Sequence, residues 1–159
     1  MSDEHQDDER WMALALQEAE AAAQKGEVPV GAVVVHQGKL LAKAHNLREL
    51  NKDPLAHAEL LAIAEAAKHL ERWRLIECTL YVTLEPCPMC AGAIVNSRLD
   101  RIVFGASDPR AGACGSVLNI VEDERLNHRP AVTGGVLQPQ CSDILSNFFR
   151  DLRARRKDP

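Results

Sequence analysis

Long apolar runs are missing from this sequence of 159 residues, and aromatic residues make up only 4% of it. The longest apolar stretches, such as GAVVV at positions 31–35, are far shorter than the roughly 20 residues that a membrane-spanning helix needs. The N-terminal stretch MSDEHQDDER is acidic and has no apolar core, so we expect no secretory signal peptide. Repeats, low-complexity tracts and Gly/Ser linkers are also absent. We therefore expect one cytoplasmic domain over residues 1–159, long enough to bury a core.

A basic field over the whole protein is lacking too, because the formal net charge is −4. The charge is distributed unevenly: the first ten residues carry five acidic side chains, and the last ten carry five basic ones. We expect the acidic segment 1–8 and the basic segment 154–159 to be mobile tails. A basic terminal helix is typical of a phosphate-binding segment and equally of a solvated helix C-terminus. The charge alone therefore identifies no nucleic-acid partner.

Cysteine is scarce and its number is odd, since the sequence has five. An odd number without a secretion signal argues for a reducing compartment and against a disulfide framework. Cys87 and Cys90 lie close together in EPCPMC, a spacing that is typical of metal binding or of redox chemistry. The other three are most simply interpreted as small buried or loop residues.

The pattern along the chain alternates between helices and strands after an initial hairpin. Apolar spacing, together with turn signals at glycines and prolines, predicts the type of each element. The predicted elements are a helix over 9–25, hairpin strands over 28–36 and 39–46, a helix over 57–70, a strand over 78–84, a helix over 88–98, strands over 101–106 and 131–137, and a helix over 141–157. The strand 78–84 carries little charge, so we expect it to be central. This order predicts an α/β protein with a mixed sheet covered by helices.

The strongest chemical signal is a pair of motifs about thirty residues apart. His57 stands in HAE at the start of a predicted helix, and Cys87 and Cys90 stand in PCPMC at the start of another. Cys87 and Cys90 alone leave a redox pair open. With His57 they form a ligand set that suits Zn²⁺, and three protein ligands leave one position for water, as in catalytic zinc sites. An H-x-E motif followed by P-C-x-x-C is the signature of nucleobase deaminases.

Glu59 follows His57 by two residues, too close to serve comfortably as a further ligand at the same helix start. We interpret it as the general acid and base that takes a proton from the water, delivers it to a ring nitrogen and later protonates the departing amine. Glu85 in EPC competes for this role, although it more plausibly holds the loop. Both ligand groups should lie at helix N-termini, where the partial positive charge favours thiolates and a neutral imidazole.

Several further segments carry a family resemblance over about 11–153. They are VPVGAVVV, AHN, DPLAHAE, RLIECTLYVTLEPCPMCAGAIVNSR, RIVFGASDPRAGACGS, LNHR and CSDILSNFFRDLR. Together they resemble the bacterial tRNA-specific adenosine deaminases, of the zinc-dependent cytidine and deoxycytidylate deaminase superfamily. The zinc motif is shared across that superfamily, and GASDPRAGACGS, LNHR and SNFFR are the more specific parts. One departure is Leu55, where the family often has threonine, which bears on the pocket wall and removes no catalytic group.

The resemblance implies a three-layer α/β/α sandwich around a five-stranded mixed sheet. It implies one zinc ion per subunit on His57, Cys87 and Cys90, with Glu59 as proton shuttle. The implied reaction is hydrolysis of adenosine to inosine at the wobble position of a tRNA anticodon. The implied partners are the tRNA anticodon stem-loop and a second subunit in a homodimer.

The resemblance also implies a set of substrate contacts. Asn46 matches a residue that hydrogen-bonds the target base, and the backbone of Ala58 faces that base. Asp108 matches a loop residue that contacts the neighbouring ribose, while Phe148 and Arg150 match a region that shapes the RNA surface. Without the resemblance, Asn46 and Asp108 are equally well interpreted as turn residues. Phe148 and Phe149 are equally well interpreted as core packing, although adjacent helical residues point about 100° apart, so that one can pack while the other faces a ligand.

Other functions remain open at this point. A guanine deaminase, or another free-base or nucleoside deaminase, could share EPCPMC. A structural zinc module that binds RNA without catalysis would need a fourth ligand, for which Cys114 and Cys141 are the candidates. A thiol redox protein would use Cys87 and Cys90 without a metal.

Overall fold

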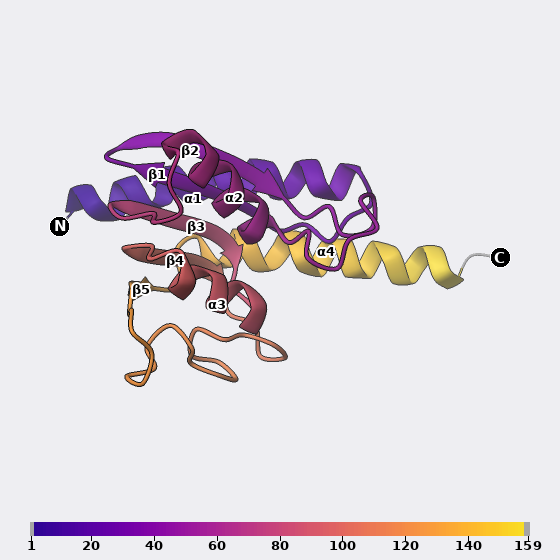
Figure 1. Ribbon diagram of the computed structural model, residues 1–159. Helices are drawn as coiled ribbons and strands as arrows, with labels where there is room; N and C mark the ends of the chain where they lie inside the picture. Colours follow the sequence, from indigo (N-terminus) through magenta and orange to yellow (C-terminus); the bar gives the residue numbers. More distant parts are fainter. Residues whose placement is uncertain (1, 158–159) are drawn as a thin grey trace.

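The computed structural model describes residues 2–157 and shows four helices and five strands over that range. Figure 1 follows the chain from α1 at the N-terminus to α4, which runs toward the C-terminus. The elements are α1 (Ser2–Gln24), β1 (Gly31–His36), β2 (Lys39–His45), α2 (Ala58–Leu70), β3 (Cys78–Leu84), α3 (Pro88–Asn96), β4 (Arg101–Ala106), β5 (Ala131–Thr133) and α4 (Gln138–Lys157).

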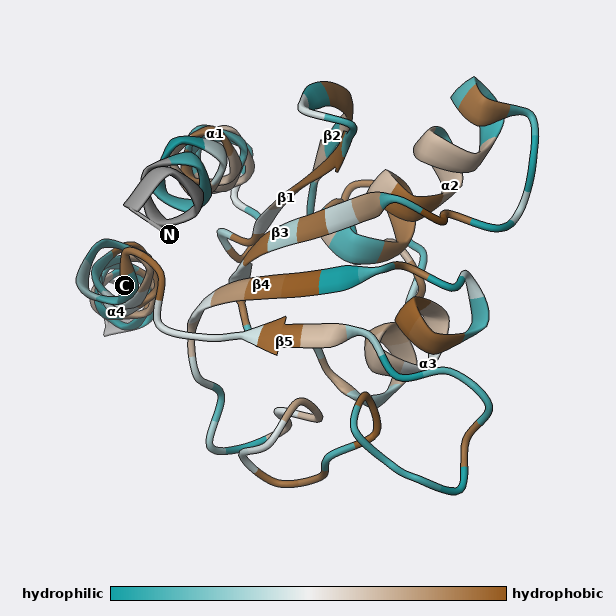
Figure 2. Ribbon diagram, turned by 90° about the vertical axis from the view of Figure 1, so that its left-hand side faces the viewer, coloured by the Kyte–Doolittle hydropathy of each residue, from teal (hydrophilic) through white to brown (hydrophobic). Residues whose placement is uncertain are grey.

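The five strands form one mixed sheet in the order β2-β1-β3-β4-β5, with β3 in the middle as predicted. β1 pairs antiparallel with both β2 and β3, whereas β3–β4 and β4–β5 are parallel pairs. In Figure 2, α1 and α4 lie on one side of the sheet and α2 and α3 on the other. The three-layer α/β/α sandwich with a five-stranded mixed sheet is therefore confirmed.

Successive side chains of each strand point to opposite faces of the sheet, so each face packs against a hydrophobic core of its own. Val33, Tyr81 and Val103 point toward α1 and α4, where Met12 is fully buried. Close packing on this face depends on Gly31, because a Cβ atom there would overlap the backbone of α1. The opposite face carries Ala32, Val34, Leu80, Val82 and Ile102 against the alanines of α2 and the apolar side of α3.

Several boundaries differ from the sequence-based prediction: β1 begins at Gly31 rather than at residue 28, and α3 ends at Asn96 rather than at residue 98. α1 begins at Ser2 rather than near residue 9, which fits the preference of acidic side chains for the first turns of a helix. β5 ends at Thr133 because Gly134 and Gly135 follow, and Gly135 has a φ of +86°. α4 begins at Gln138, three residues before the predicted start.

The predicted tails fall largely inside these terminal helices. Residues 2–8 form the first turns of α1, and residues 154–157 form the last turn of α4. Asp8 is buried, and its carboxylate binds Arg101 through two hydrogen bonds of 2.8 and 2.7 Å. Mobility of the tails stays a prediction, and residues 1, 158 and 159 lie outside the described residues.

The topology brings several loops to one edge of the sheet. Because β3 and β4 are parallel, their carboxyl-terminal ends lie side by side at the same edge of the sheet, across the strand direction. The segments that follow both strands emerge there. α3 begins directly beyond β3 at Pro88. Within the described part of the chain, no helix has the length and apolarity required to cross a membrane.

Candidate active site

The first residues of α2 and α3 meet at this edge of the sheet. His57 is the N-cap of α2, and Cys87 is the N-cap of α3, with Pro88 in the first turn. Cys90 lies in the same first turn and is fully buried. Each motif therefore sits at a helix N-terminus, where unpaired backbone N–H groups favour negative charge.

The three side chains have the spacing of a metal site. The Nδ1 atom of His57 lies 3.6 Å from the Sγ atom of Cys87 and 3.6 Å from the Sγ atom of Cys90. All three donor atoms lie within 4.8 Å of one another. Tetrahedral Zn²⁺ with Zn–N bonds of about 2.0–2.1 Å and Zn–S bonds of about 2.3 Å places nitrogen and sulfur about 3.5 Å apart. The donor set and its spacing therefore fit zinc.

The two thiols are electrostatically unlike. The Cys90 thiol donates to Cys87, and this hydrogen bond is the main reason that the pKa of Cys87 falls to about 5, against the opposing effect of burial. The same hydrogen bond, together with burial, raises the pKa of Cys90. The pair thus has one sulfur that is readily a thiolate, the form that binds metal.

Glu59 lies in the first turn of α2, and only 4% of its surface is exposed. Burial raises the pKa of its carboxyl group to about 7, and the negative charge of Cys87 adds to the effect. Its side chain also contacts Cys90 through a hydrogen bond. A carboxyl group with a pKa near neutrality, beside a metal-ligand cluster, is suited to take up and release protons.

A cavity of about 310 Å³ opens beside these residues. Of the residues predicted from sequence, His57, Cys87, Glu59, Asn46, Ala58 and Asp108 line it. Val28, Val30, Arg48, Leu84, Glu85, Ala111 and Phe149 complete the lining. The structure therefore brings the three expected ligands, the expected proton shuttle and three of the five expected substrate contacts together.

Asn46 is buried at the end of β2 and is tied to the neighbouring segment. Its Nδ2 atom donates to the Val28 carbonyl at 3.2 Å, and its Oδ1 atom accepts the Arg48 N–H at 3.1 Å. The turn interpretation of Asn46 thus matches these contacts. A primary amide has two N–H donors and two acceptor lone pairs, so Asn46 keeps one donor and one acceptor for a ligand.

Glu85 holds the loop on the other side of the cavity. Its carboxylate accepts backbone N–H groups of Asp108 at 3.0 Å, Cys114 at 3.0 Å and Ser116 at 3.1 Å, and also the Ser116 hydroxyl. Burial opposes ionisation of Glu85, but these hydrogen bonds outweigh it and lower the pKa. Gly112 is required beside it, because a Cβ atom there would overlap the Glu85 carboxylate. The loop-holding interpretation of Glu85 agrees with this geometry.

Asp108 forms a turn of its own within that loop. Its Oδ1 atom accepts the N–H of Arg110 at 2.9 Å and that of Ala111 at 3.3 Å. The side chain is half-buried at the cavity wall. Both the turn interpretation and a contact with a ligand are compatible with this position.

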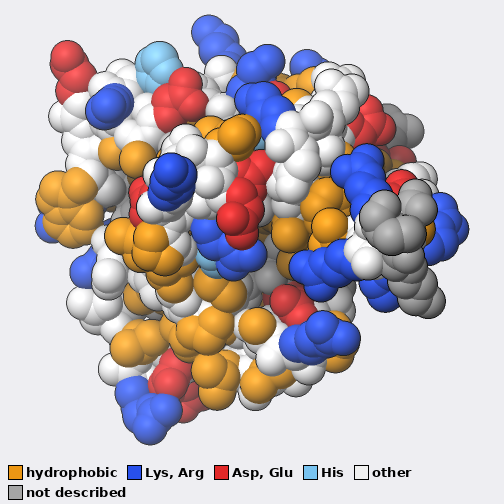
Figure 3. Space-filling model, turned by 90° about the vertical axis from the view of Figure 1, so that its right-hand side faces the viewer, with side chains coloured by type: hydrophobic (Ala, Val, Ile, Leu, Met, Phe, Trp, Pro, Cys, Tyr) orange, Lys and Arg blue, Asp and Glu red, His pale blue; other side chains and the backbone are white. Residues whose placement is uncertain are grey.

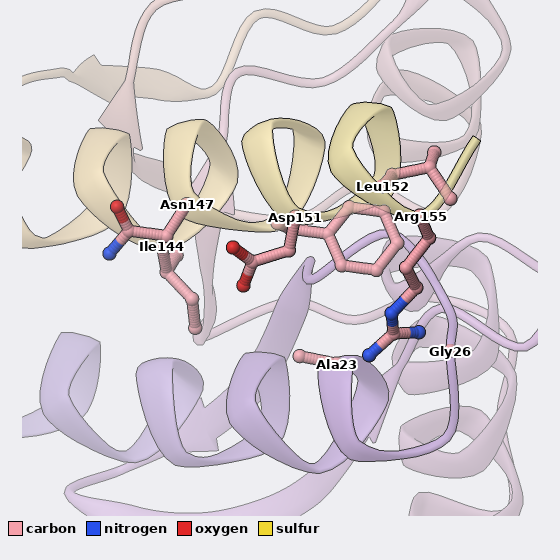
Figure 4. A pocket seen from close by; sticks show the side chains of 8 residues that line it. Ala23, Gly26, Ile144, Asn147, Asp151, Leu152 and Arg155 are labelled. Atoms are coloured by element: carbon pink, nitrogen blue, oxygen red, sulfur yellow. The ribbon is translucent and has the colours of Figure 1, made fainter. Parts of the chain in front are cut away.

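The structure separates the two phenylalanines of α4. Phe149 lines the cavity, whereas Phe148 lines a groove of about 220 Å³ between α4 and the end of α1. Figure 4 shows this second groove, with the Arg155 side chain of α4 extending toward Ala23 of α1. The rings of Phe148 and Phe149 meet edge to face, with their centroids 5.5 Å apart. Sequence reasoning had named Phe148; the 100° offset between neighbours gave no sign of which one faces the cavity.

Arg150 does not join the cavity lining. Its guanidinium group is exposed and lies 3.9 Å from the carboxylate of Asp151. The arginine of α4 that lies near the site is Arg153, one turn further along the helix, in a groove of about 580 Å³ that shares Asp108 and Phe149 with the cavity. Figure 3 looks onto this face and shows Lys and Arg side chains around the end of α4. The basic C-terminal stretch predicted from sequence includes Arg153 without singling it out, whereas nothing in the local sequence marks Arg48.

The remaining cysteines lie apart from the ligand cluster. Cys141, on α4, is fully buried in the core that α1 and α4 form against the sheet, and Cys114 is buried on the opposite face of the sheet. Burial raises the pKa of each thiol to about 12. Among the described residues, the group that could hold a metal consists of His57, Cys87 and Cys90.

Comparison with known proteins agrees with this geometry over nearly the whole chain. The family profile of MafB19-like deaminases matches residues 6–153. A tRNA-specific adenosine deaminase of Bacillus subtilis (strain 168) is 54% identical over 150 residues, which cover 94% of this chain and 93% of that protein. A tRNA-specific adenosine deaminase of Haemophilus influenzae is 48% identical over 94% of this chain and 87% of that protein.

Solved structures give the same result. A structure from a study of A-to-I editing by tRNA:A34 deaminases at the wobble position of transfer RNA superimposes with a TM-score of 0.83. It is 40% identical, over 86% of this chain and 99% of that one. A guanine deaminase from Bacillus subtilis superimposes with a TM-score of 0.60 and is 38% identical over 62% of this chain and 64% of that one.

Proposed function

Because this chain belongs to the family of tRNA-specific adenosine deaminases, we propose that it hydrolyses adenosine to inosine at position 34, the wobble position, of a tRNA anticodon. The observation that carries this proposal is the cavity in which His57, Cys87 and the buried Glu59 converge. The overall reaction consumes one water molecule and releases ammonia.

His57, Cys87 and Cys90 would hold one Zn²⁺ ion, as their donor spacing supports. Three protein ligands are the number that catalytic zinc sites use. When bound, the ion supplies Lewis acidity that brings the pKa of a water molecule from about 15.7 to near 7.

Glu59 moves the protons of the reaction. Its carboxylate accepts a proton from the attacking water and delivers it to a ring nitrogen of the purine, which makes the carbon that bears the amine more electrophilic. The same carboxyl group later protonates the departing amine, so that ammonia leaves. General acid–base catalysis of this kind is typically worth about 10²–10⁴-fold in rate. The raised pKa of Glu59, about 7, suits both directions of transfer near neutral pH.

Asn46 and the first turn of α2 would orient the base. The spare donor and acceptor of Asn46 suit a purine edge, and the backbone of Ala58 lies beside them in the cavity wall. Asp108 and Phe149 lie where the cavity continues into the neighbouring groove, in reach of the adjoining nucleotide. Phe148 and Arg150, which the resemblance also implies, would contribute only to the outer RNA surface of α4.

A tRNA anticodon loop suits a recessed cavity because its bases are already unpaired. Extrusion of a base from a duplex costs a few kcal/mol, and a hairpin loop avoids much of that cost. Arg48, Arg110 and Arg153 line the cavity or the adjoining groove, and their positive charges would attract the phosphates that flank the base. We also propose that the enzyme works in the cytoplasm as a homodimer, which sedimentation equilibrium of the zinc-loaded protein tests.

The decisive experiment is incubation of the zinc-loaded protein with a tRNA anticodon stem-loop that carries adenosine at position 34. Sequencing should show conversion to inosine at that position. Glu59→Gln is the matched control, because it should keep one zinc per chain by elemental analysis while its kcat falls about 10²–10⁴-fold.

The likeness to a guanine deaminase makes free guanine the competing substrate. Turnover of guanine without turnover of the stem-loop would overturn the proposal. Binding of the stem-loop that is unaffected by Glu59→Gln, with no inosine formed, would instead favour a non-catalytic zinc module.

A further inference from the structure

Glu27 is a buried carboxylate to which the chemistry proposed above gives no part. Only 1% of its surface is exposed, and it lies in the segment that leads from α1 into β1. Its Oε1 atom accepts the Glu49 N–H at 3.0 Å, and its Oε2 atom accepts the Leu50 N–H at 2.8 Å. Hydrogen bonds to an ionised acceptor are roughly twice as strong as neutral ones. Glu27 therefore fixes the middle of the loop 46–57 to a distant part of the chain.

The loop 46–57 connects two residues of the site. It begins at Asn46 and ends at His57, and it is closed at its base by the Leu47 N–H, which donates to the Ala56 carbonyl at 3.0 Å. Arg48, within the loop, lines the cavity. An anchor in the middle of this loop thus acts on residues that face the substrate.

The Glu27 contacts extend a series of bonds along one cavity wall. The Asn46 N–H donates to the Val30 carbonyl at 3.0 Å, and the Asn46 side chain donates to the Val28 carbonyl at 3.2 Å. Val28 and Val30 both line the cavity. Because Glu27 directly precedes Val28, one short segment holds both the start and the middle of the loop.

We propose that Glu27 is a positioning residue for the substrate side of the site, whose carboxylate fixes the loop 46–57 so that Asn46 and Arg48 face the bound nucleotide. The inference rests on the proposed function. It predicts an effect on substrate binding more than on the chemical step. His57 begins α2 and lies against Cys87 and Cys90, which hold it independently of the loop.

Glu27→Gln tests the proposal. It keeps the shape of the side chain, but its NH₂ group replaces one of the two oxygens that accept the Glu49 and Leu50 N–H groups. The KM for the stem-loop should rise about tenfold, the size of one hydrogen bond to a charged group, while kcat stays within about threefold. Hydrogen exchange of the Glu49 and Leu50 amides should accelerate about tenfold or more. Glu27→Asp, which keeps the charge, should recover part of the lost affinity.

Asp8→Asn is the matched control. Asp8 is also buried and also anchors distant segments, but it binds Tyr81 and Arg101 at the opposite end of β4. Both Asp8→Asn and Glu27→Gln should lower the thermal midpoint, because each disturbs a buried anchor. Asp8→Asn should leave the KM unchanged, whereas Glu27→Gln should raise it.

Each outcome decides the proposal. An unchanged KM in Glu27→Gln, despite accelerated exchange at Glu49 and Leu50, overturns the positioning role. Unchanged exchange at both amides overturns the anchoring contact itself. A wild-type protein that forms no inosine overturns the proposed function and the positioning role with it, and this failure is recognised without any variant.

Discussion

Replacement of Glu85 by glutamine distinguishes a loop anchor from a proton shuttle. The wild-type carboxylate accepts hydrogen bonds from the backbone of Asp108, Cys114 and Ser116 and from the Ser116 hydroxyl. A glutamine amide can turn its oxygen toward the Cys114 and Ser116 N–H groups, and its NH₂ group can donate to the Ser116 hydroxyl. The Asp108 N–H then meets a donor and loses its partner.

The expected loss in the free energy of unfolding follows from that single lost hydrogen bond and from the lost charge. A hydrogen bond to a charged group contributes about 1.5–3 kcal/mol, and Asp108 lies where water can partly replace the acceptor. We expect a loss of about 2 kcal/mol in the free energy of unfolding. For a domain of this size, each kcal/mol shifts Tm by about 2–4 °C, so Tm should fall by about 4–8 °C. The KM should rise as well, because Asp108 and Ala111 line the cavity.

Glu59→Gln should behave in the opposite way. Its kcat should fall about 10²–10⁴-fold, because the amide cannot accept or release the protons of the reaction. Its Tm should stay within about 2 °C of the wild type, because the Glu59 side chain faces Cys90 and the cavity and holds no loop backbone. Scanning calorimetry and steady-state kinetics on the stem-loop measure both variants. If Glu85→Gln lost its turnover at unchanged Tm, Glu85 would be the shuttle and the assignment of Glu59 would be wrong.

Three further predictions concern the metal, the RNA and the core. Chelation should lower the Tm of the wild type but not of His57→Ala, because the ion ties α2 to α3; added Zn²⁺ should restore the wild-type value, and equal shifts in both proteins would contradict the ligand set. Arg153→Gln should reduce the slope of log binding constant against log salt concentration by about 1 for the stem-loop, as measured by fluorescence anisotropy, whereas the exposed control Arg125→Gln should leave the slope unchanged. Equal slopes in the two variants would place the RNA elsewhere. Gly31→Ala should destabilise the domain by about 3 kcal/mol in urea unfolding through overlap with α1, whereas Gly92→Ala, with open space around it, should not; a neutral Gly31→Ala would show that α1 can shift away.

The sequence predicts the ligand cluster well because each part of it is local. Cys87 and Cys90 are fixed by one strand-to-helix turn, and His57 is fixed by one helix start. Strand alternation likewise predicts the five strands, and the scarcity of charge in 78–84 predicts the central position of β3. The early start of α1 is not predicted, because residues 2–8 have no apolar periodicity and their acidic side chains were interpreted as a tail.

The outer walls of the site are harder to predict because they depend on contacts between distant segments. Phe149 rather than Phe148 faces the cavity because of the angle at which α4 is rotated against α1 and β4. That rotation is set by packing between α4 and distant elements, such as Cys141 of α4 against Gly105 of β4, where a Cβ atom on residue 105 would overlap the Cys141 sulfur. No spacing within α4 itself carries this information.

Three buried glutamates show the same limit most clearly. Glu27, Glu59 and Glu85 are 1%, 4% and 2% exposed, so burial does not separate their roles. Their partners do: Glu27 and Glu85 accept backbone N–H groups of the two loops that flank the cavity, whereas Glu59 faces the thiols and the cavity itself. The hydrogen bonds that Glu85 accepts favour its charged form and lower its pKa, so this carboxylate is poorly suited to take up a proton near neutral pH. Burial raises the pKa of Glu59 to about 7 and outweighs the backbone and Cys90 hydrogen bonds that lower it. Because Glu59 also faces the cavity, the proton chemistry is assigned to it.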